Sequence, residues 1–466
     1  MIKQVLWNKD ELSKALGQKV NQSCCDITGV SIDTRTIAKG DLFLALKGNN
    51  FDGNAFVDEA IVKGASLCIV DNIDKVKEKN RDKIVLVSNV ANALNELAIY
   101  RRNSLQGKVI CITGSVGKTS TKEMLGLALS ANGKTYASYK NFNNHYGLPL
   151  SLMRTPIDTE FCILELGMSR TGEIKHLSKI AQPNIAIITN VEAVHLEFFN
   201  SVTEIAYAKA EIFEGMKTPS FAILNMDNIH YDILYKQALK KSIRTITFGS
   251  STKSDFYVNN IRYLANNDQL VNINCLGKTI QQKFHKDIGK HIIFNSLAVF
   301  ACLNLLNVNL VIAQKALEKF TLFAGRGEIT ILPNNIMLID ESYNASPAAV
   351  IASIENLLSY KKRNSRIIAV LGDMKELGKE EVKFHQNINL EGIDIIFCVG
   401  KLMKYLYDKT CPNIRGAFTN NAEEMANIIS DYIQHNDIIL VKGSFSMNMK
   451  LIVNKIKHLL YSSDII

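Results

Sequence analysis

The sequence predicts an α/β protein of three domains, and three observations support this prediction. The chain has 466 residues, which at roughly 100 to 200 residues per domain suggests about three compact units. Short runs rich in β-branched residues alternate with longer helical periodicities, a pattern typical of strands joined by helices into mainly parallel sheets. Hydrophobic residues make up 47% of the chain and charged residues 21%, as in ordinary globular domains. We therefore expect the whole chain to fold.

Residues 1–105 are predicted to form a smaller N-terminal α/β domain. Its strand candidates are ASLCIVD at residues 65–71 and KIVLVSN at residues 83–89. The amphipathic segment LNELAIYRRN at residues 94–103 then predicts a helix that leads out of this domain.

Residues 106–320 are predicted to form a central domain with a doubly wound, mainly parallel sheet. Residues 250–285 alternate polar with apolar side chains, which favours a small antiparallel appendage. The strand candidates of the central domain are KVICITG (108–114), FCILELG (161–167), PNIAIITNV (183–191) and SFAILNMD (220–227).

Residues 321–466 are predicted to form a third, Rossmann-like domain, because four more strand candidates alternate there with helical segments. These candidates are NNIMLIDES (334–342), SRIIAVLGD (365–373), DIIFCVG (394–400) and DIILVKGS (437–444).

The net charge of +9, from 54 basic and 45 acidic residues, is compatible with nucleic acid, an anionic membrane surface, a polyanionic small substrate, or a lysine-rich composition without functional meaning. No block of five or more basic residues with interleaved aromatic residues occurs, which weakens the nucleic-acid interpretation. No apolar run reaches the roughly 18 to 20 residues of a membrane-spanning helix, and the start is charged. We expect a cytoplasmic protein with no nucleic-acid partner and no membrane insertion. Cysteines inside apolar runs predict reduced core residues: Cys68, Cys111, Cys162 and Cys398.

The strongest local signal is the segment from Val109 to Glu123, VICITGSVGKTSTKE, which predicts a buried strand, a glycine-containing turn and a helix. Such a phosphate-binding loop (P-loop) works because backbone N–H groups and the helix N-terminus point at the anion. Lys118 would neutralise the β- and γ-phosphates of ATP, and the Thr119 hydroxyl would be a ligand of Mg²⁺. The full GxxxxGK[ST] pattern requires glycine where this chain has Ile112, so the loop is a shortened form. Nucleotide binding is assigned to Gly114, Ser115, Val116, Gly117, Lys118, Thr119 and Ser120.

Three residues beyond the loop are candidates for the same site. Glu165 ends a predicted strand at the carboxyl edge of the sheet, where doubly wound folds place ligands, and it would supply a carboxylate for the metal. His195 follows the next predicted strand, and Lys209 lies in a helical segment. Taken singly, each has a structural alternative: a surface glutamate, a hydrogen-bonded loop histidine and a solvated helix lysine.

Eight motifs are spread over essentially the whole chain. They are SIDTRTIAKGDLFLALKGNNFDGNAF at residues 31–56, TGSVGKTSTKE, NFNNHYGLPL, ELGMSRTGEI, GRGE, DESYNASP, LGDMKELG and LVKGSFSM. Through these motifs the chain resembles the Mur ligases, the ATP-dependent amide ligases that build the peptide of bacterial peptidoglycan. The segment at residues 31–56 is similar to the uridine-nucleotide segment of that family, and NFNNHYGLPL and DESYNASP favour the branch that adds D-alanyl-D-alanine to UDP-N-acetylmuramoyl tripeptide.

Where a residue of this chain matches a motif position of the family, the resemblance implies the role that the family has at that position. The resemblance implies that Thr119, Glu165 and His195 surround Mg²⁺. It also implies that Lys209 is carried as a carbamate, which helps to bind a second Mg²⁺, and it makes Lys118, His195 and Lys209 the catalytic set. Tyr343 and Asn344 would lie near the nucleotide, with a packing role equally open. The other implied positions are Asn295 near the adenine, Arg326 at the phosphates, Asp340 on the ribose, Ser31, Asp33, Thr34 and Arg35 at the UDP-sugar, and Asn143 and Asn144 at the muropeptide.

Three positions depart from the family pattern. Asn54 stands where histidine is common, Ile292 where asparagine is usual, and Phe445 where arginine is usual. They concern uridine binding, packing at the ATP site and a contact to a substrate carboxylate, respectively.

The resemblance implies a reaction in which the tripeptide carboxylate attacks the γ-phosphate of ATP, and the amine of the dipeptide then attacks the resulting acyl phosphate. Small-molecule substrates and a monomer are expected. Two alternatives stay open: a ligase that adds the third amino acid to UDP-N-acetylmuramoyl dipeptide, whose usual D-N-P-R element does not occur here, and a P-loop NTPase switch, which the loop alone would fit. The sequence does not decide whether the third residue of the acceptor is diaminopimelate or lysine.

Overall fold

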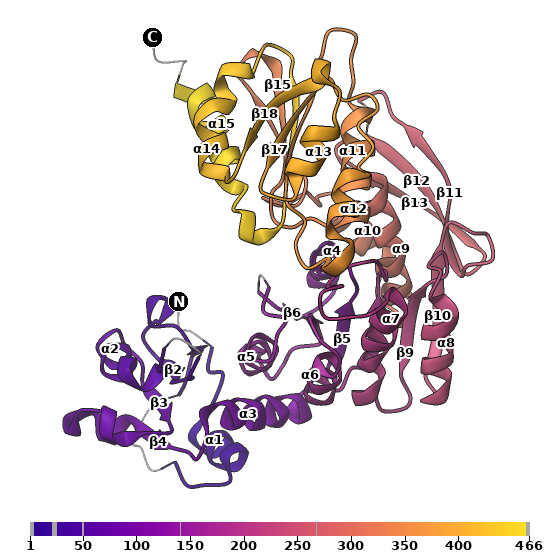
Figure 1. Ribbon diagram of the computed structural model, residues 1–466. Coiled ribbons are helices and arrows are strands. Elements are labelled where there is room, and N and C mark those ends of the chain that lie inside the picture. The colour runs from indigo at the N-terminus through magenta and orange to yellow at the C-terminus, as the bar shows by residue number, and fades with distance from the viewer. Residues whose placement is uncertain (1–3, 21–25, 49–50, 140, 267, 463–466) are drawn as a thin grey trace.

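The computed structural model describes residues 4–20, 26–48, 51–139, 141–266 and 268–462. Within them the chain forms three sheets, one after another along the sequence and built mostly of parallel strands (Figure 1). The three-domain α/β fold is confirmed. The predicted boundaries at residues 105 and 320 fall between successive sheets.

The N-terminal sheet has four parallel strands in sequential order. Helix α1 begins after Asn8, which forms a capping box with Glu11, and it ends at Gly17, where φ is 62°. The elements are α1 (Lys9–Leu16), β1 (Gly29–Ser31), β2 (Asp41–Leu44), α2 (Val57–Val62), β3 (Leu67–Val70) and β4 (Ile84–Leu86).

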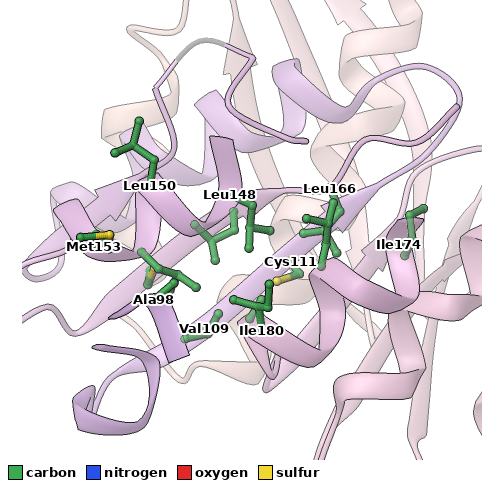
Figure 2. Packing of buried hydrophobic residues seen from close by; sticks show 14 of the residues in the cluster. Ala98, Val109, Cys111, Leu148, Leu150, Met153, Leu166, Ile174 and Ile180 are labelled. Atoms are coloured by element: carbon green, nitrogen blue, oxygen red, sulfur yellow. The ribbon is translucent and has the colours of Figure 1, made fainter. Parts of the chain in front are cut away.

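Helix α3 (Val90–Ser104) leaves the N-terminal sheet and packs against the central domain. Its buried face joins one hydrophobic cluster with α5 (Gly147–Arg154) and α6 (Glu173–Ala181). Figure 2 shows Ala98 of α3 in this cluster, together with Val109 and other residues of the central domain. Burial of shared apolar surface therefore holds the two domains together.

Polar groups reinforce the same junction. The indole N–H of Trp7 donates to the carbonyl of Met153 at 2.8 Å, and the Arg101 guanidinium lies 4.1 Å from the centre of the Trp7 ring. Arg102 donates from Nε to the carbonyl of Ala181, at the end of α6, at 2.7 Å. The helix predicted to lead out of the first domain thus also belongs to the core of the second.

The central sheet has nine strands in the order β13-β12-β11-β10-β9-β8-β5-β7-β6. Strand β5 lies between β8 and β7 and is parallel to both, so the order of winding reverses there. In doubly wound sheets a ligand binds outside the carboxyl ends of the strands at such a reversal. The elements are β5 (Lys108–Thr113), α4 (Lys118–Ser130), β6 (Thr135–Ala137), β7 (Phe161–Glu165), β8 (Ile185–Ile188), α7 (Val202–Ala210), β9 (Phe221–Asn225), α8 (Tyr231–Lys240), β10 (Arg244–Gly249), α9 (Lys290–Leu305) and α10 (Leu310–Leu317).

The region predicted as an antiparallel appendage is antiparallel, but it continues the central sheet. Strand β11 (Phe256–Tyr263) pairs in parallel with β10, and β12 (Gln269–Cys275) and β13 (Lys278–Phe284) then add two antiparallel strands. Helix α9 covers this extension, because buried residues of α9 and of all three strands share one hydrophobic cluster.

The C-terminal sheet has six strands in the order β14-β15-β19-β16-β17-β18, and only β14 is antiparallel to its neighbour. All four predicted strands lie in it, and the two that the sequence pattern missed are the edge strands β14 and β18. The elements are β14 (Glu328–Leu332), β15 (Ile336–Glu341), α11 (Pro347–Ser359), β16 (Ile367–Gly372), α12 (Glu381–Gln386), β17 (Ile395–Val399), α13 (Met403–Lys409), β18 (Arg415–Thr419), α14 (Ala422–Ile428), β19 (Ile438–Lys442) and α15 (Lys450–Ser462).

Among the described helices, none combines the length and the apolar character needed to cross a bilayer. Of the described cysteines, all are free thiols and only Cys411 is exposed. Cys68, Cys111, Cys162 and Cys398 are buried, as their apolar sequence surroundings predicted.

Candidate active site

A cleft of about 1350 Å³ lies between the central and C-terminal domains. It opens where the carboxyl ends of β5, β7 and β8 meet the N-terminus of α4, and in Figure 1 the C-terminal domain lies directly above α4. Most of the residues proposed for nucleotide and metal binding line it: Ser115, Val116, Gly117, Lys118, Thr119, Ser120, Asn143, Asn144, Glu165, His195, Asn295, Arg326, Tyr343 and Asn344.

The phosphate-binding loop runs from β5 to α4, and two glycines make its course possible. Gly114 and Gly117 have φ of 152° and 84°, which side chains disfavour. A Cβ on Gly114 would lie 2.0 Å from the Thr189 hydroxyl, and one on Gly117 would lie 2.9 Å from the Asn295 amide. Asn295 of α9 therefore packs against the loop itself.

Lys118 begins α4 and folds back over the loop. Its ammonium group donates to the carbonyl oxygens of Gly114 at 2.6 Å and Ser115 at 3.3 Å. Burial lowers the pKa of Lys118, and the nearby positive charge of Arg326 lowers it further, whereas Glu165 acts in the opposite direction. An anion bound in the loop would stabilise the charged form of Lys118 against both its burial and the repulsion from Arg326.

Thr119, Glu165 and Asn143 meet at the floor of the cleft. The Thr119 hydroxyl donates to one carboxylate oxygen of Glu165 at 3.0 Å, and the Asn143 amide donates to the other at 2.9 Å. Glu165 is only 2% exposed, and within the described residues no Lys, Arg or His forms a salt bridge with it. A buried carboxylate without a cationic partner is a natural ligand for a metal ion.

Lys209 of α7 is also buried, at 2% exposure. Burial, together with the nearby charge of Lys118, holds the pKa of the Lys209 ammonium group well below its usual value. The described part of the chain gives it no hydrogen-bond acceptor and no carboxylate partner. The solvated-lysine interpretation is therefore wrong, and a neutral amine is the form that can react with CO₂.

His195 contacts a residue of the C-terminal domain. Its Nδ1 pairs with the carboxylate of Glu376, and this hydrogen bond lowers the pKa of Glu376 although partial burial acts against it. His195 thus lies at the cleft as predicted, with a partner that sequence reasoning did not identify.

Arg326 and part of the DESYNASP segment line the cleft from the C-terminal domain. The Arg326 guanidinium lies 4.0 Å from the centre of the Tyr343 ring, and the Phe445 ring lies 5.6 Å from that of Tyr343. Phe445 is 70% exposed, so an aromatic face is open to the cleft where the family pattern has arginine. Ile292, the second departure, is a buried residue of α9 that belongs to the apolar cluster of the central domain and also lines the cleft.

Asp340 does not reach the cleft in this structure. Its carboxylate is fully buried at the end of β15, and it accepts hydrogen bonds from Lys450 at 2.5 Å and from the Ser342 hydroxyl at 2.6 Å. The ribose role of Asp340 stays a prediction.

The residues proposed for the UDP-sugar lie in the N-terminal domain, away from the cleft. Asp33 caps the 3₁₀ turn that contains Thr34, and it forms a salt bridge of 2.6 Å with Arg35, whose side chain is 85% exposed. The Ser31 hydroxyl is buried and donates to the carbonyl of Asp33. Asn54, the first departure, is buried and bonds Asp52 and Asp71, which gives it a structural role.

The side chains of Asn143 and Asn144 differ in which of their hydrogen-bonding groups are already occupied. Asn143 is engaged with Glu165, whereas the Asn144 side-chain oxygen accepts from the backbone N–H of Gly147 at 2.8 Å, at the start of α5. The side-chain N–H groups of Asn144 have no acceptor within the described residues and remain available to a ligand.

Sequence reasoning missed a buried ion pair at the same cleft. Lys442, at the end of β19, donates to Glu341 at 2.9 Å and to the carbonyl of Asn344 at 3.1 Å. Burial acts to raise the pKa of Glu341, but Lys442, helped by the Ser353 hydroxyl and by His291, lowers it overall. Burial lowers the pKa of the neighbouring His291. The available signal was position, because Glu341 and Lys442 both end strands at the ligand-binding edge of the third sheet.

No cluster of three or more His, Cys, Asp or Glu side chains suited to a metal occurs in the described residues. The set proposed from the sequence is of another kind, because it combines a hydroxyl, one carboxylate, one imidazole and a modified lysine.

Comparisons with known proteins assign each part of the chain to one kind of enzyme. Family models match residues 26–102 (Mur ligase family, catalytic domain), 112–303 (Mur ligase middle domain) and 325–445 (Mur ligase, glutamate ligase domain). The UDP-N-acetylmuramoyl-tripeptide–D-alanyl-D-alanine ligase of Rickettsia prowazekii is 35% identical over 465 residues, which cover 97% of this chain and 99% of that protein.

Solved structures agree with this similarity. A crystal structure of MurF from Acinetobacter baumannii has a TM-score of 0.84 at 28% identity, over 97% of this chain and 99% of that one. The MurF ligase of Thermotoga maritima in complex with ADP has a TM-score of 0.78 at 27% identity, over 93% and 98%.

Proposed function

Because the chain belongs to the Mur ligase family, we propose that it is the ATP-dependent ligase that joins D-alanyl-D-alanine to UDP-N-acetylmuramoyl tripeptide, in peptidoglycan precursor synthesis. The observation that carries this proposal is the joint occurrence of a phosphate-binding loop and a buried, unpaired carboxylate, Glu165, in a cleft closed by a second domain. Such a cleft can hold ATP and a second substrate while excluding water.

The chemistry requires a carboxylate oxygen to become a leaving group. The terminal carboxylate of the tripeptide attacks the γ-phosphorus of ATP, the bond from that phosphorus to the β–γ bridging oxygen breaks, and ADP leaves. The amine of the dipeptide then attacks the acyl carbon, loses a proton, and phosphate departs as the amide forms. Two anions meet in the first step, so the site must offset their repulsion.

Lys118 and the loop N–H groups at the start of α4 are proposed to hold the phosphates. Arg326, which lines the same cleft from the C-terminal domain, would supply a second positive charge to the phosphates. The N–H groups of Asn144 are proposed to bind the muropeptide, and Asn143 to orient Glu165. In the N-terminal domain, Arg35 and its neighbours are proposed to bind the UDP end of the substrate.

The residues present fit Mg²⁺, which we include in the proposal. Thr119 and Glu165 would hold one ion with hard oxygen ligands, His195 would complete the set, and a carbamate on Lys209 would help to hold a second ion. When bound, Mg²⁺ supplies charge neutralisation of the phosphate oxygens. Two features of the described residues support this assignment: Glu165 is buried without a salt-bridge partner, and Lys209 is buried without a hydrogen-bond acceptor.

A cytoplasmic location is part of the proposal, because the reaction consumes ATP and the buried thiols are unpaired. The proposal also takes the enzyme to be a monomer acting on small molecules. A ligase that adds the third amino acid shares the fold, but the relatives of comparable length named above carry the dipeptide-adding activity.

The test is ADP release by the purified full-length protein with ATP and Mg²⁺, with each substrate omitted in turn. We expect ADP release over many turnovers only when both UDP-N-acetylmuramoyl tripeptide and D-alanyl-D-alanine are present, because the first step alone yields at most one ADP per enzyme molecule. Running the assay with diaminopimelate-containing and lysine-containing tripeptides identifies the acceptor. Multiple-turnover ADP release without the dipeptide, or with UDP-N-acetylmuramoyl dipeptide and a free amino acid, would refute the proposal and favour an NTPase or the third-residue ligase.

A further inference from the structure

One of the contacts between the central and C-terminal domains is a side-chain pair that lines the cleft. His195 lies in the loop after β8, and Glu376 lies in the loop after β16, 181 residues later. The Glu376 carboxylate contacts Nδ1 of the imidazole. This pair crosses the domain boundary at the place where the proposed chemistry occurs.

The backbones of both loops are held in an uncommon conformation. His195 has φ of 57° and Glu376 has φ of 63°, values that non-glycine residues adopt only where their surroundings enforce them. The N–H of Glu197 donates to the carbonyl of Glu376 at 3.2 Å. A Cβ on Gly378 would lie 2.7 Å from the carbonyl oxygen of Leu196, so the two loops touch along their main chains.

The loop that carries Glu376 is anchored within its own domain. The Asp373 carboxylate accepts hydrogen bonds from the N–H of Met403 at 2.9 Å and from the Lys375 side chain at 2.9 Å. The N–H of Lys375 donates to the Ser444 hydroxyl at 2.8 Å. Glu376 is therefore presented to the central domain from a fixed position, as residues that orient others require.

The second ring nitrogen of His195, Nε2, is available to a ligand in the cleft. Within the described residues Nε2 of His195 makes no hydrogen bond, and the residue lines the cleft beside Glu376. In a neutral imidazole, a carboxylate at Nδ1 keeps the proton there and leaves a lone pair on Nε2. Metal-binding histidines are commonly fixed in this way by a carboxylate on the opposite nitrogen.

We propose that Glu376 is the positioning residue of His195: across the domain boundary it fixes the Nδ1–H tautomer and the orientation of the ring, so that Nε2 faces the phosphate-handling site. This inference rests on the proposed function for its consequence, because only a working ligase needs Nε2 of His195. The geometry on which it rests is independent of any bound ligand.

The test compares Glu376→Ala and Glu376→Gln with a matched control, Glu380→Gln. Glu380 is an exposed carboxylate four residues further on, and among the described residues its one ion pair is with Lys383 at 2.9 Å. Long-range ¹H–¹⁵N correlation spectra of the ligand-free, full-length protein at neutral pH report the tautomer of each histidine, and the His195 signals are identified by their loss in His195→Gln. We expect the Nδ1–H form in the wild type and the control, and a shift towards Nε2–H in Glu376→Ala.

Activity supplies the second readout. Because loss of such a partner typically costs 10- to 100-fold in metal affinity or activity, the Mg²⁺ concentration for half-maximal turnover should rise about tenfold in Glu376→Ala. Glu376→Gln should restore the tautomer and much of the Mg²⁺ response, since its amide oxygen can still accept from Nδ1–H. The KM for the UDP-muropeptide should not change.

An unchanged His195 tautomer in Glu376→Ala would overturn the proposal. It would also be overturned if Glu376→Gln needed as much Mg²⁺ for half-maximal turnover as Glu376→Ala does. The spectra need no substrate. If the tautomer shifts in Glu376→Ala but the wild type makes no ligation product, the proposed function is refuted and the positioning role stands. If the wild type does make the product but the tautomer is the same in Glu376→Ala, the proposed function stands and the positioning role is refuted.

Discussion

The Thr119 hydroxyl lies 3.0 Å from a carboxylate oxygen of Glu165, although 46 residues separate them in sequence. Parallel pairing explains this proximity. Strand β5 leads into the loop and α4, where Thr119 lies, and β7 pairs with β5 and ends at Glu165. Adjacent parallel strands thus bring a hydroxyl and a carboxylate to one edge, beside the phosphate-binding loop.

Lys118→Ala should lower kcat by at least about 10²-fold, the usual cost of removing one group that stabilises transition-state charge. The loop amides at Gly114 and Gly117 would remain, so ATP should still bind. Turnover at saturating substrates and the thermal unfolding temperature are the measurements. A folded variant with near-normal ligation would contradict the role assigned to Lys118.

Lys209→Ala should be nearly inactive, because it removes the amine that would carry the carbamate. Formate or acetate should restore part of the activity by occupying the vacated anionic position. Lys209→Arg should be inactive too, since a guanidinium stays cationic and cannot be carbamylated. Incubation of the wild type with ¹³C-bicarbonate should give a carbamate ¹³C resonance that Lys209→Ala lacks. An active arginine variant would rule out the carbamate.

The sequence indicated which residues line the cleft better than it indicated which of them contact one another. Gly114, Lys118 and Thr119 were identified because a strand, a glycine turn and a helix start leave a local pattern. The pair of His195 and Glu376 could not be found, because it depends on how two domains dock, and no local periodicity encodes that.

The fold shows the same division. Buried strands such as β5 and β16 were predicted from their apolar runs, whereas the edge strands β14 and β18 and the interior strands β2 and β10 were missed. The helix at residues 94–103 was predicted from its amphipathic pattern, but that pattern does not say which core receives its apolar face. In the structure this face packs in one hydrophobic cluster with the helices α5 and α6 of the central domain.

Arg35→Ala should raise the KM for the UDP-muropeptide far more than the KM for ATP or D-alanyl-D-alanine. The guanidinium is exposed and bonds only Asp33 among the described residues, so its removal should leave the fold intact. Steady-state kinetics with each substrate varied in turn is the measurement. Equal increases in all three KM values would point to a folding defect or to a different site.

Asp52→Asn should make the N-terminal domain less sensitive to acid. Hydrogen bonds from Lys75 and Asn54 lower the pKa of Asp52 to about 2. Because its unfolded-state pKa is about 3.9, the ionised group contributes stability at higher pH, and this contribution is lost as pH falls from about 5 to about 2. Fluorescence of Trp7, the single tryptophan, reports urea unfolding. The wild type should lose more stability than Asp52→Asn between pH 5 and pH 3; equal losses would contradict the assignment.

The most direct test of the central claim, that this chain activates a carboxylate with ATP to form an amide, is an oxygen-tracing experiment. UDP-N-acetylmuramoyl tripeptide with both oxygens of its terminal carboxylate labelled with ¹⁸O is incubated with the enzyme, ATP, Mg²⁺ and D-alanyl-D-alanine, and the products are analysed by mass spectrometry. The account predicts UDP-N-acetylmuramoyl pentapeptide that retains one ¹⁸O in the new amide and inorganic phosphate that carries the other. Unlabelled phosphate, or ATP consumed without pentapeptide, would contradict it.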